Sequence, residues 1–550
     1  MHSMKKRAMW KFSRETTMIG LALAAIIGFA SSPLLTGGLF RYQMDLNFIL
    51  MRIDGLKDGL LSGEFPVRIQ PNWLNGYGYA TSIFYGDLFL TVPAVLRILG
   101  LSVQGAYFAY QLCVNAATCL IAYYCFKGMF GSRQIALVGS CVYTLSTFRL
   151  MLVYVLTRGG MYTAYTFLPL AAYGIYLIYF DCRNQKSWFY LAIGMTGIIQ
   201  SHLLTAQVTV FTIALIILVS IKSFFQKKRL LAMIKAVAAS IVLNIGFLVP
   251  LLDYIGDMHV SSDSWKEIWN FIQRKGEDGS GFFAMFREGN STQAPDMILI
   301  FGMLLFLILL VCSDRQEGVK YRKIGSVTGT VSLLLLFMGT KYFPWDQIEI
   351  CFPNSRMIVN SLQFPHRFYE TGIVLMVITL CCGLIMLKEQ IGDRSEYRTG
   401  VALIFCICLL SAGYILSNLI NHESVTKLYN TGDLDDKWIN TEEYLPEGAE
   451  PELFTLETAS AGDGVRISSY KKEALHIQMQ CTNEGNGSGY VELPLVYYKG
   501  YQARDRADND LEVICGENKT VVLKIPPNYR GEVSVFSRNR CYGQLHFGFR

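Results

Sequence analysis

Charged residues are scarce in this sequence. Asp, Glu, Lys and Arg make up 17% of the 550 residues, whereas 52% are hydrophobic and the mean hydropathy is +0.31. Typical soluble domains carry about 25% charged residues, so the composition excludes an ordinary soluble protein and indicates a polytopic membrane protein. Runs such as MIGLALAAIIGFASSPLL and MILIFGMLLFLILLVC have the length that a hydrocarbon core requires of a helix, and they lack the alternation of outer-membrane barrel strands.

Motifs of the common soluble enzyme classes are also absent. The sequence holds no P-loop, no dinucleotide-binding G-x-G-x-x-G, no H-E-x-x-H and no G-x-S-x-G nucleophile elbow. Its 14 cysteines form no C-x-x-C pair, so no zinc site is indicated, and a disulfide among Cys481, Cys515 and Cys541 is left open. The net charge of +6 is spread over loops, so we expect no nucleic-acid partner.

The apolar segments predict about eleven membrane-spanning helices. They lie near residues 17–36, 104–126, 134–152, 162–180, 187–203, 205–222, 231–252, 295–312, 324–342, 370–387 and 399–419. Basic clusters precede the first segment and recur in every second loop, which places the N-terminus in the cytoplasm under the positive-inside rule. An odd number of spans then places the C-terminus outside. Counting 82–100 as a span would break this pattern, so we interpret it as a helix on the outer face.

The chain divides into two predicted domains. Residues 1–420 form a membrane domain whose first outer loop is 37–103, and residues 421–550 form an extracytoplasmic β-rich domain. In the second domain, short runs alternate apolar and polar residues between turn residues, which is typical of an antiparallel β-sandwich. The acidic stretch 430–452 is expected to link the two.

The first outer loop carries an amphipathic pattern. Apolar residues recur at steps of three and four from Leu46, which predicts a helix on the membrane surface with Arg52, Lys57 and Asp58 away from the apolar stripe. Asp45 stands immediately before this helix. As an N-cap it would stabilise the first turn, and as a carboxylate at the membrane surface it would serve as a general base or metal ligand. One residue can do both.

Four motifs carry a resemblance to a known family. DLNFILMRIDGLKDGLLSGEFPVRI, NGYGYATSIFYGDLFLTVPAVLRILG, SHLLTA and SLQFPHRF resemble a bacterial membrane-protein family labelled as related to 6-pyruvoyl-tetrahydropterin synthase, which is similar to the GT-C superfamily of glycosyltransferases. The resemblance implies a sugar donor on polyprenyl phosphate at the outer face and an acidic residue in the first outer loop. Carried over to this sequence, Asp45 would deprotonate the acceptor hydroxyl or organise a divalent metal ion.

Further charged residues are candidates for substrate contacts. Arg367 in SLQFPHRF is expected at the outer end of a span, where it would bind a lipid phosphate or snorkel to the interface. Arg158 and His202 are also expected on the outer side, and a structural hydrogen-bonding role competes with a functional one for His202. Four charged residues of the first loop are candidates for binding the acceptor or a lipid head group: Arg52, Asp54, Glu64 and Arg68. For each of them, the alternative is an ion pair within the loop or a solvated charge.

The sequence departs from the family's pattern at two positions, and three tyrosines of the first loop have two possible roles. Many relatives carry Trp at the position of His366, and related sequences often have a Glu shortly after the position of Arg158, which this chain lacks. Tyr77, Tyr79 and Tyr85 would stack on a sugar or belong to an interfacial aromatic belt.

The resemblance, together with the membrane-protein pattern, therefore implies an integral-membrane glycosyltransferase. It would move a sugar from a polyprenyl-phosphate carrier to an extracytoplasmic glycan or polymer, such as a cell-wall polymer, teichoic acid or exopolysaccharide, with the lipid bilayer as its surroundings. The alternative is a lipid or polysaccharide transporter or a non-catalytic envelope assembly factor. Transporters place ionisable residues near the middle of the membrane, whereas here the polar residues gather at the outer face.

Overall fold

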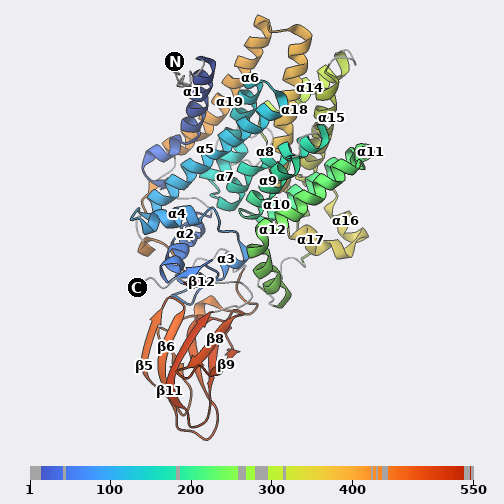
Figure 1. Cartoon of the computed structure of the whole chain (residues 1–550). Helices are drawn as coiled ribbons and strands as arrows, with labels where there is room; N and C mark the ends of the chain where they lie inside the picture. Colours follow the sequence, from blue (N-terminus) through green and yellow to red (C-terminus); the bar gives the residue numbers. More distant parts are fainter. Residues whose placement is uncertain are drawn as a thin grey trace, which may run out of the picture.

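The structure is a computed structural model with a helical region followed by a β-rich domain (Figure 1). It describes residues 14–40, 45–180, 186–257, 260, 268–269, 271–278, 295–313, 318–422, 425–428, 431–436, 444–537 and 545–546. Cys541 and part of the linker predicted at 430–452 lie outside these residues.

The long helices of the first region follow the apolar segments of the sequence. They are α1 (Arg14–Ala30), α5 (Val103–Phe130), α6 (Arg133–Thr144), α7 (Thr147–Tyr154), α8 (Gly159–Phe180), α9 (Ser187–Ile199), α10 (Leu203–Val219), α12 (Lys227–Asp257), α14 (Met297–Cys312), α15 (Val319–Met338), α18 (Phe368–Ile391) and α19 (Ser395–His422). Short helices α11 (Ile221–Phe224), α16 (Trp345–Cys351) and α17 (Arg356–Asn360) lie between them.

Several of these helices are suited to cross a bilayer. By length and composition, five described helices qualify (α5, α8, α12, α18 with the turn before it, and α19), or six if the pair α6–α7, bent by 44°, is one span. Four further apolar helices, among them α10 and α14, are shorter. The chain is thus a multi-pass membrane protein with a helical N-terminal region, and the count of about eleven spans stays a prediction.

The first loop forms a layer of short elements between the helices and the β-rich domain (Figure 1). It contains β1 (Leu39–Phe40), α2 (Leu46–Leu61), β2 (Glu64–Phe65), α3 (Thr81–Phe84) and α4 (Thr91–Ile98). The helix predicted from Leu46 is α2. The segment 82–100 holds two short helices, α3 and α4, because residues 85–90 interrupt it, and neither is long enough to span a bilayer.

The C-terminal domain is one continuous antiparallel sheet. Its strands are β4 (Ser460–Ala461), β5 (Val465–Glu473), β6 (His476–Asn483), β7 (Gly489–Val496), β8 (Tyr501–Asp505), β9 (Asp510–Cys515), β10 (Thr520–Ile525) and β11 (Arg530–Ser537), in the order β4-β7-β10-β9-β8-β11-β6-β5. Side chains alternate between core and solvent as predicted: Ile477, Met479 and Cys481 of β6 are buried. Both halves of the sheet contribute to one core, with Leu493 and Leu523 from one half and Val533 from the other.

Two small strand pairs tie distant parts of the chain together. β1 pairs with β3 (Val425–Thr426), and β2 pairs with β12 (Leu545–His546), both antiparallel. The first loop is therefore fixed to segments on both sides of the β-rich domain.

Candidate functional site

Three arginines from distant segments converge where the first loop meets the helices. Arg52 comes from α2, Arg158 from the turn before α8, and Arg367 from the 3-10 turn Pro365–Arg367 before α18. All three act electrostatically on the buried side chain of His202, and together with its burial they hold the pKa of His202 well below 6.5. We call Arg52, Arg158, Arg367 and His202 the arginine cluster.

Arg52 is held by an aromatic ring and a carboxylate. Its guanidinium lies 4.3 Å from the ring centre of Tyr85, and its Nη2 donates to Asp87 Oδ1 at 2.5 Å. Arg52 was expected to lie away from the apolar stripe of the helix, and its side chain is nevertheless buried. Residues 85–98 cover that face of α2, which local periodicity does not reveal. Arg52 thus forms an ion pair within the first loop.

A glycine allows the first loop to approach the turn that carries His202. A Cβ atom added at Gly86 would lie 2.3 Å from the carbonyl oxygen of Gln200, a distance that side chains do not tolerate. The same approach brings the Tyr85 ring within 5.7 Å of the His202 ring. Tyr85 therefore lies between Arg52 and His202.

His202 begins α10 and is tied to a buried carboxylate through Thr205. The backbone N–H of Thr205 donates to His202 Nδ1 at 3.1 Å, so the neutral ring carries its proton on Nε2. The Thr205 hydroxyl lies 2.8 Å from the same nitrogen and donates to Glu370 Oε2 at 2.6 Å. These contacts fix the orientation of the His202 ring. His202 therefore has a structural hydrogen-bonding role, whether or not it also has a functional one.

Arg158 and Arg367 both lie beside the ring of Phe364, and Arg158 also contacts the imidazole of His366. Arg158 Nη1 donates to His366 Nε2 at 2.9 Å, and its guanidinium lies 5.1 Å from the Phe364 ring centre. Arg367 Nη2 donates to Gln363 Oε1 at 2.5 Å and lies 5.7 Å from the same ring. A further cation stacks on Phe364, because Lys275 Nζ lies 4.5 Å from the ring centre.

Asp45 lies beside this cluster. It occupies the N-cap position of α2, where its backbone carbonyl accepts from Ile49 N at 3.1 Å. Its side chain makes no capping hydrogen bond among the described residues, and it acts electrostatically on Arg158. Burial lowers the pKa of the Arg158 guanidinium, and Asp45 and Glu370 act in the opposite direction. Asp45 is half-buried.

A small cavity opens between the first loop and the helices. It has a volume of about 200 Å³, and Arg52, Tyr110 and Thr163 are among the polar side chains that line it. Gly86, Gly159 and Gly160 also line it, and each packs so closely on a neighbouring residue that an added Cβ atom would clash.

Three of the predicted binding residues lie elsewhere. Asp54 is fully buried in an ion pair with Arg97, with Nε 2.7 Å from Oδ1. Arg68 donates to the carbonyl of Gly246 in α12 at 2.6 Å. Glu64 lies in β2, and burial raises its pKa to about 7. None of the three joins the arginine cluster in the part of the chain described.

Sequence reasoning missed several members of the site. They are Asp87, Thr205, Lys275, Gln363 and Glu370. Glu370 carried a signal in the sequence itself, because it is a carboxylate at the end of the apolar span predicted at 370–387, and ionisable residues in such spans are by default functional candidates. Tyr77 and Tyr79 are fully buried, whereas Tyr85 is partly exposed beside the cluster.

A metal ion has no evident set of ligands. Within the described ranges, no group of three or more His, Cys, Asp or Glu residues is placed to hold one. We therefore derive the chemistry below from the chain's own side chains.

Comparisons with known proteins give one sequence relative. No family model matches the chain. A protein of Lactococcus lactis subsp. cremoris (strain MG1363), described as an uncharacterized protein, is 23% identical over 560 residues, which cover 90% of this chain and 87% of the relative.

Solved membrane glycosyltransferases are also similar in structure. The arabinofuranosyltransferase AftD from Mycobacteria matches with a TM-score of 0.46 and 10% identity, over 75% of this chain and 27% of that one. The archaeal oligosaccharyltransferase AglB from Archaeoglobus fulgidus, in complex with an inhibitory peptide and a dolichol-phosphate, matches with a TM-score of 0.42 and 13% identity, over 76% and 57%. The chain thus spans less than two thirds of these proteins, and the function proposed below rests on its own residues.

Proposed function

We propose that this protein is an integral-membrane glycosyltransferase that moves a sugar from a polyprenyl-phosphate carrier to a hydroxyl of an extracytoplasmic glycan or polymer. The observation that carries the proposal is the convergence of Arg52, Arg158 and Arg367 around His202, with the Asp45 carboxylate at its edge. A polyprenyl-phosphate donor would reach this site from the bilayer that surrounds the helices.

The cluster suits a lipid phosphate. Guanidinium groups bind phosphate oxygens in bidentate geometry and stay charged in partly buried sites. Arg52 and Arg158 are oriented by aromatic rings and by Asp87 and His366, so little reorganisation is needed when negative charge develops on a leaving phosphate. The neutral ring of His202 offers its Nε2–H as a further hydrogen-bond donor.

The reaction is a displacement at the anomeric carbon of the donor sugar. The acceptor oxygen forms a bond to this carbon while the bond from the carbon to the phosphate oxygen breaks, and polyprenyl phosphate leaves with the electron pair. Asp45 takes the proton of the acceptor hydroxyl as general base. The arginines neutralise the charge on the leaving phosphate, which therefore needs no acid to protonate it.

The acceptor is proposed to enter from the side of the β-rich domain. Tyr444, which lies in the linker segment predicted at 430–452, packs with its ring centre 6.4 Å from that of Tyr85. Aromatic faces of this kind stack on sugar rings, so Tyr85 and Tyr444 would form the edge of an acceptor path. The acceptor class is a cell-wall polymer, a teichoic acid or an exopolysaccharide.

The test is Asp45→Asn in purified protein with a labelled polyprenyl-phosphate sugar and a glycan acceptor. We expect transfer to fall by at least about 100-fold, the scale of general-base catalysis, with unchanged folding. Asp58→Asn is the matched control, because Asp58 lies on the same helix and pairs with Lys57 at 3.0 Å, away from the cluster. It should keep full activity.

Two outcomes would contradict the proposal. If Asp45→Asn transfers sugar at the rate of the unmodified protein, Asp45 is not the base. If the unmodified protein moves the labelled lipid between bilayer leaflets without releasing or transferring sugar, the protein is a transporter.

A further inference from the structure

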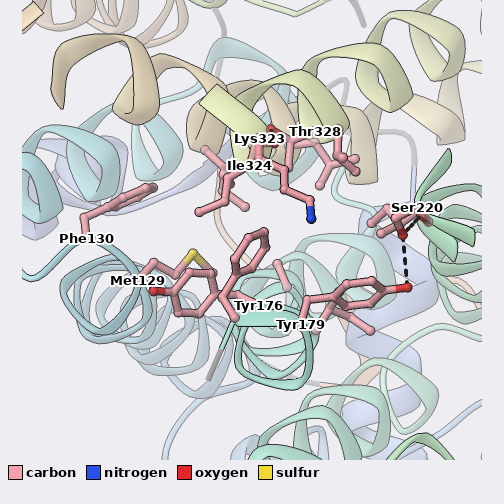
Figure 2. Close-up of a pocket in the computed structure, with 15 residues that line it drawn as sticks. Met129, Phe130, Tyr176, Tyr179, Ser220, Lys323, Ile324 and Thr328 are labelled. Atoms are coloured by element: carbon pink, nitrogen blue, oxygen red, sulfur yellow. Dashed lines mark hydrogen bonds between the residues drawn. The ribbon is translucent and has the colours of Figure 1, made fainter. Parts of the chain in front are cut away.

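A second cavity lies at the other end of the helical region. It is an apolar crevice whose space, counted together with the solvent-filled part at its opening, is about 640 Å³. One wall is α8, with Ala172, Tyr176 and Tyr179, and the opposite wall is α15, with Ile324 and Val327. Figure 2 shows the two tyrosines facing Lys323, Ile324 and Thr328 across the space.

Helix packing explains why the crevice exists. α8 packs on α5 and α9, whereas α15 packs on α18, so the facing sides of α8 and α15 are left apart. Leu375 and Ile378 of α18 form the floor. From Arg158 to Tyr179 the chain runs along α8 for roughly 30 Å at about 1.5 Å per residue, so this crevice is separate from the arginine cluster.

Cations gather at the rim of this otherwise apolar space. Lys323 lines the crevice, is exposed, and takes part in no ion pair within the described part of the chain. Lys320 Nζ donates to the Tyr176 hydroxyl at 2.7 Å, and Arg229 Nη2 donates to the Tyr179 carbonyl at 2.7 Å. The nearby carboxylate on α18 is Glu389, which acts electrostatically on Tyr321.

We propose that this crevice binds one acyl chain of an anionic phospholipid, with the phosphate of the lipid held by Lys323 and Lys320. The apolar walls take the chain, because its methylene groups make van der Waals contacts with the apolar side chains that line the crevice. The two lysines take the head group, as basic residues at membrane surfaces bind anionic lipids. The site does not depend on the proposed glycosyltransferase activity.

A phospholipid fits better than the tail of a polyprenyl phosphate bound at the arginine cluster. Such a donor would have its phosphate at the opposite end of the helices, so its far end would bring no negative charge to Lys323. The cationic rim therefore indicates an amphiphile whose own head group lies at this end.

The test is native mass spectrometry of the full-length protein in detergent, titrated with phosphatidylglycerol or with phosphatidylcholine of the same acyl chains. We expect at least fivefold more bound phosphatidylglycerol than phosphatidylcholine. Lys323→Glu should reduce bound phosphatidylglycerol to the level of phosphatidylcholine. Val327→Trp, which fills the crevice, should reduce both lipids.

Lys127→Glu is the matched control. Lys127 is an exposed lysine in the last turn of α5, at the same end of the helices, and does not line the crevice. It should bind phosphatidylglycerol as the unmodified protein does. Equal binding of the two lipids by the unmodified protein, or equal losses for Lys323→Glu and Lys127→Glu, would overturn the proposal. The proposal would also be overturned if added polyprenyl phosphate displaced phosphatidylglycerol from the unmodified protein and did not bind to Val327→Trp.

Discussion

His202 is a residue whose surroundings decide its chemistry. It is buried at the start of α10, and the charges of Arg52, Arg158 and Arg367 add to burial in lowering its pKa well below 6.5. Thr205 N–H donates to its Nδ1, which a protonated ring could not accept. The ring is therefore neutral at physiological pH, and it supplies a hydrogen-bond donor without adding charge.

This environment predicts a pH dependence of stability. In the unfolded chain His202 binds a proton below about pH 6.5, its ordinary pKa, whereas in the folded protein it does not until the pH is much lower. The unfolded state thus binds more protons below this value, and the free energy of unfolding falls as the pH is lowered from 6.5. In His202→Asn, whose side-chain oxygen retains the helix cap, this fall should be smaller.

The measurement is thermal unfolding in detergent between pH 5 and pH 8 for both proteins. The difference between the two curves isolates His202 from the other titrating groups. Parallel curves across this range would show that His202 titrates normally, and that the arginines do not act on it as the geometry indicates.

At the scale of elements, α2 and the segment 85–98 act as one unit. Two ion pairs join them, Arg52 with Asp87 and Asp54 with Arg97. Both Arg52 and Asp54 are almost fully buried, so their charges are compensated by partners rather than by water. This unit positions Tyr85 beside His202.

Removing one partner of a buried pair leaves the other charge uncompensated. Asp54→Asn should therefore destabilise the protein by about 3 kcal/mol, measured by chemical denaturation in detergent micelles. Asp393→Asn is the control, because Asp393 pairs with Arg398 on an exposed surface, and it should have no measurable effect. A loss for Asp54→Asn no larger than for the control would show that the pair does not stabilise the first loop.

At the scale of the whole molecule, the β-rich domain is docked on the first loop. The carbonyl of Tyr77 accepts from Val496 N at 3.0 Å, and its hydroxyl accepts from Leu456 N at 2.7 Å. Its ring stacks on Phe454 with centres 4.9 Å apart. Lys472 of β5 donates to the carbonyl of Gly76 at 2.7 Å, so one short loop segment anchors several parts of the domain.

Tyr77→Ala should loosen this interface, because truncating a buried aromatic residue costs about 3–5 kcal/mol. We expect faster limited proteolysis between the two regions and faster hydrogen exchange at 444–456, with the strands β5 to β11 still protected. Tyr77→Phe keeps the ring stack and loses only the hydroxyl contact, so its effect should be about 1 kcal/mol. Unchanged proteolysis of Tyr77→Ala would mean that other contacts hold the domain.

Much of the architecture could be predicted from local patterns. Apolar runs predicted the long helices, steps of three and four residues predicted α2, and alternation predicted the strands of the C-terminal domain. Side-chain directions repeat with a fixed period in helices and in strands, so the pattern of apolar and polar residues within one element reveals its type. Residues 82–100 form two helices where one was expected.

The candidate site was only partly predictable. Asp45, Arg52, His202 and Arg367 stood in the quoted motifs and lie together with Arg158, whereas Asp54, Glu64 and Arg68 stood in the same motif as Asp45 and lie apart. The sequence by itself determined a multi-pass helical protein with a β-rich end, because the apolar pattern that marks a buried helix or strand is set by residues only a few positions apart. Only the tertiary structure decided which charges meet, because Arg158 and His366 are separated by 208 positions, and no local pattern records a contact over that distance.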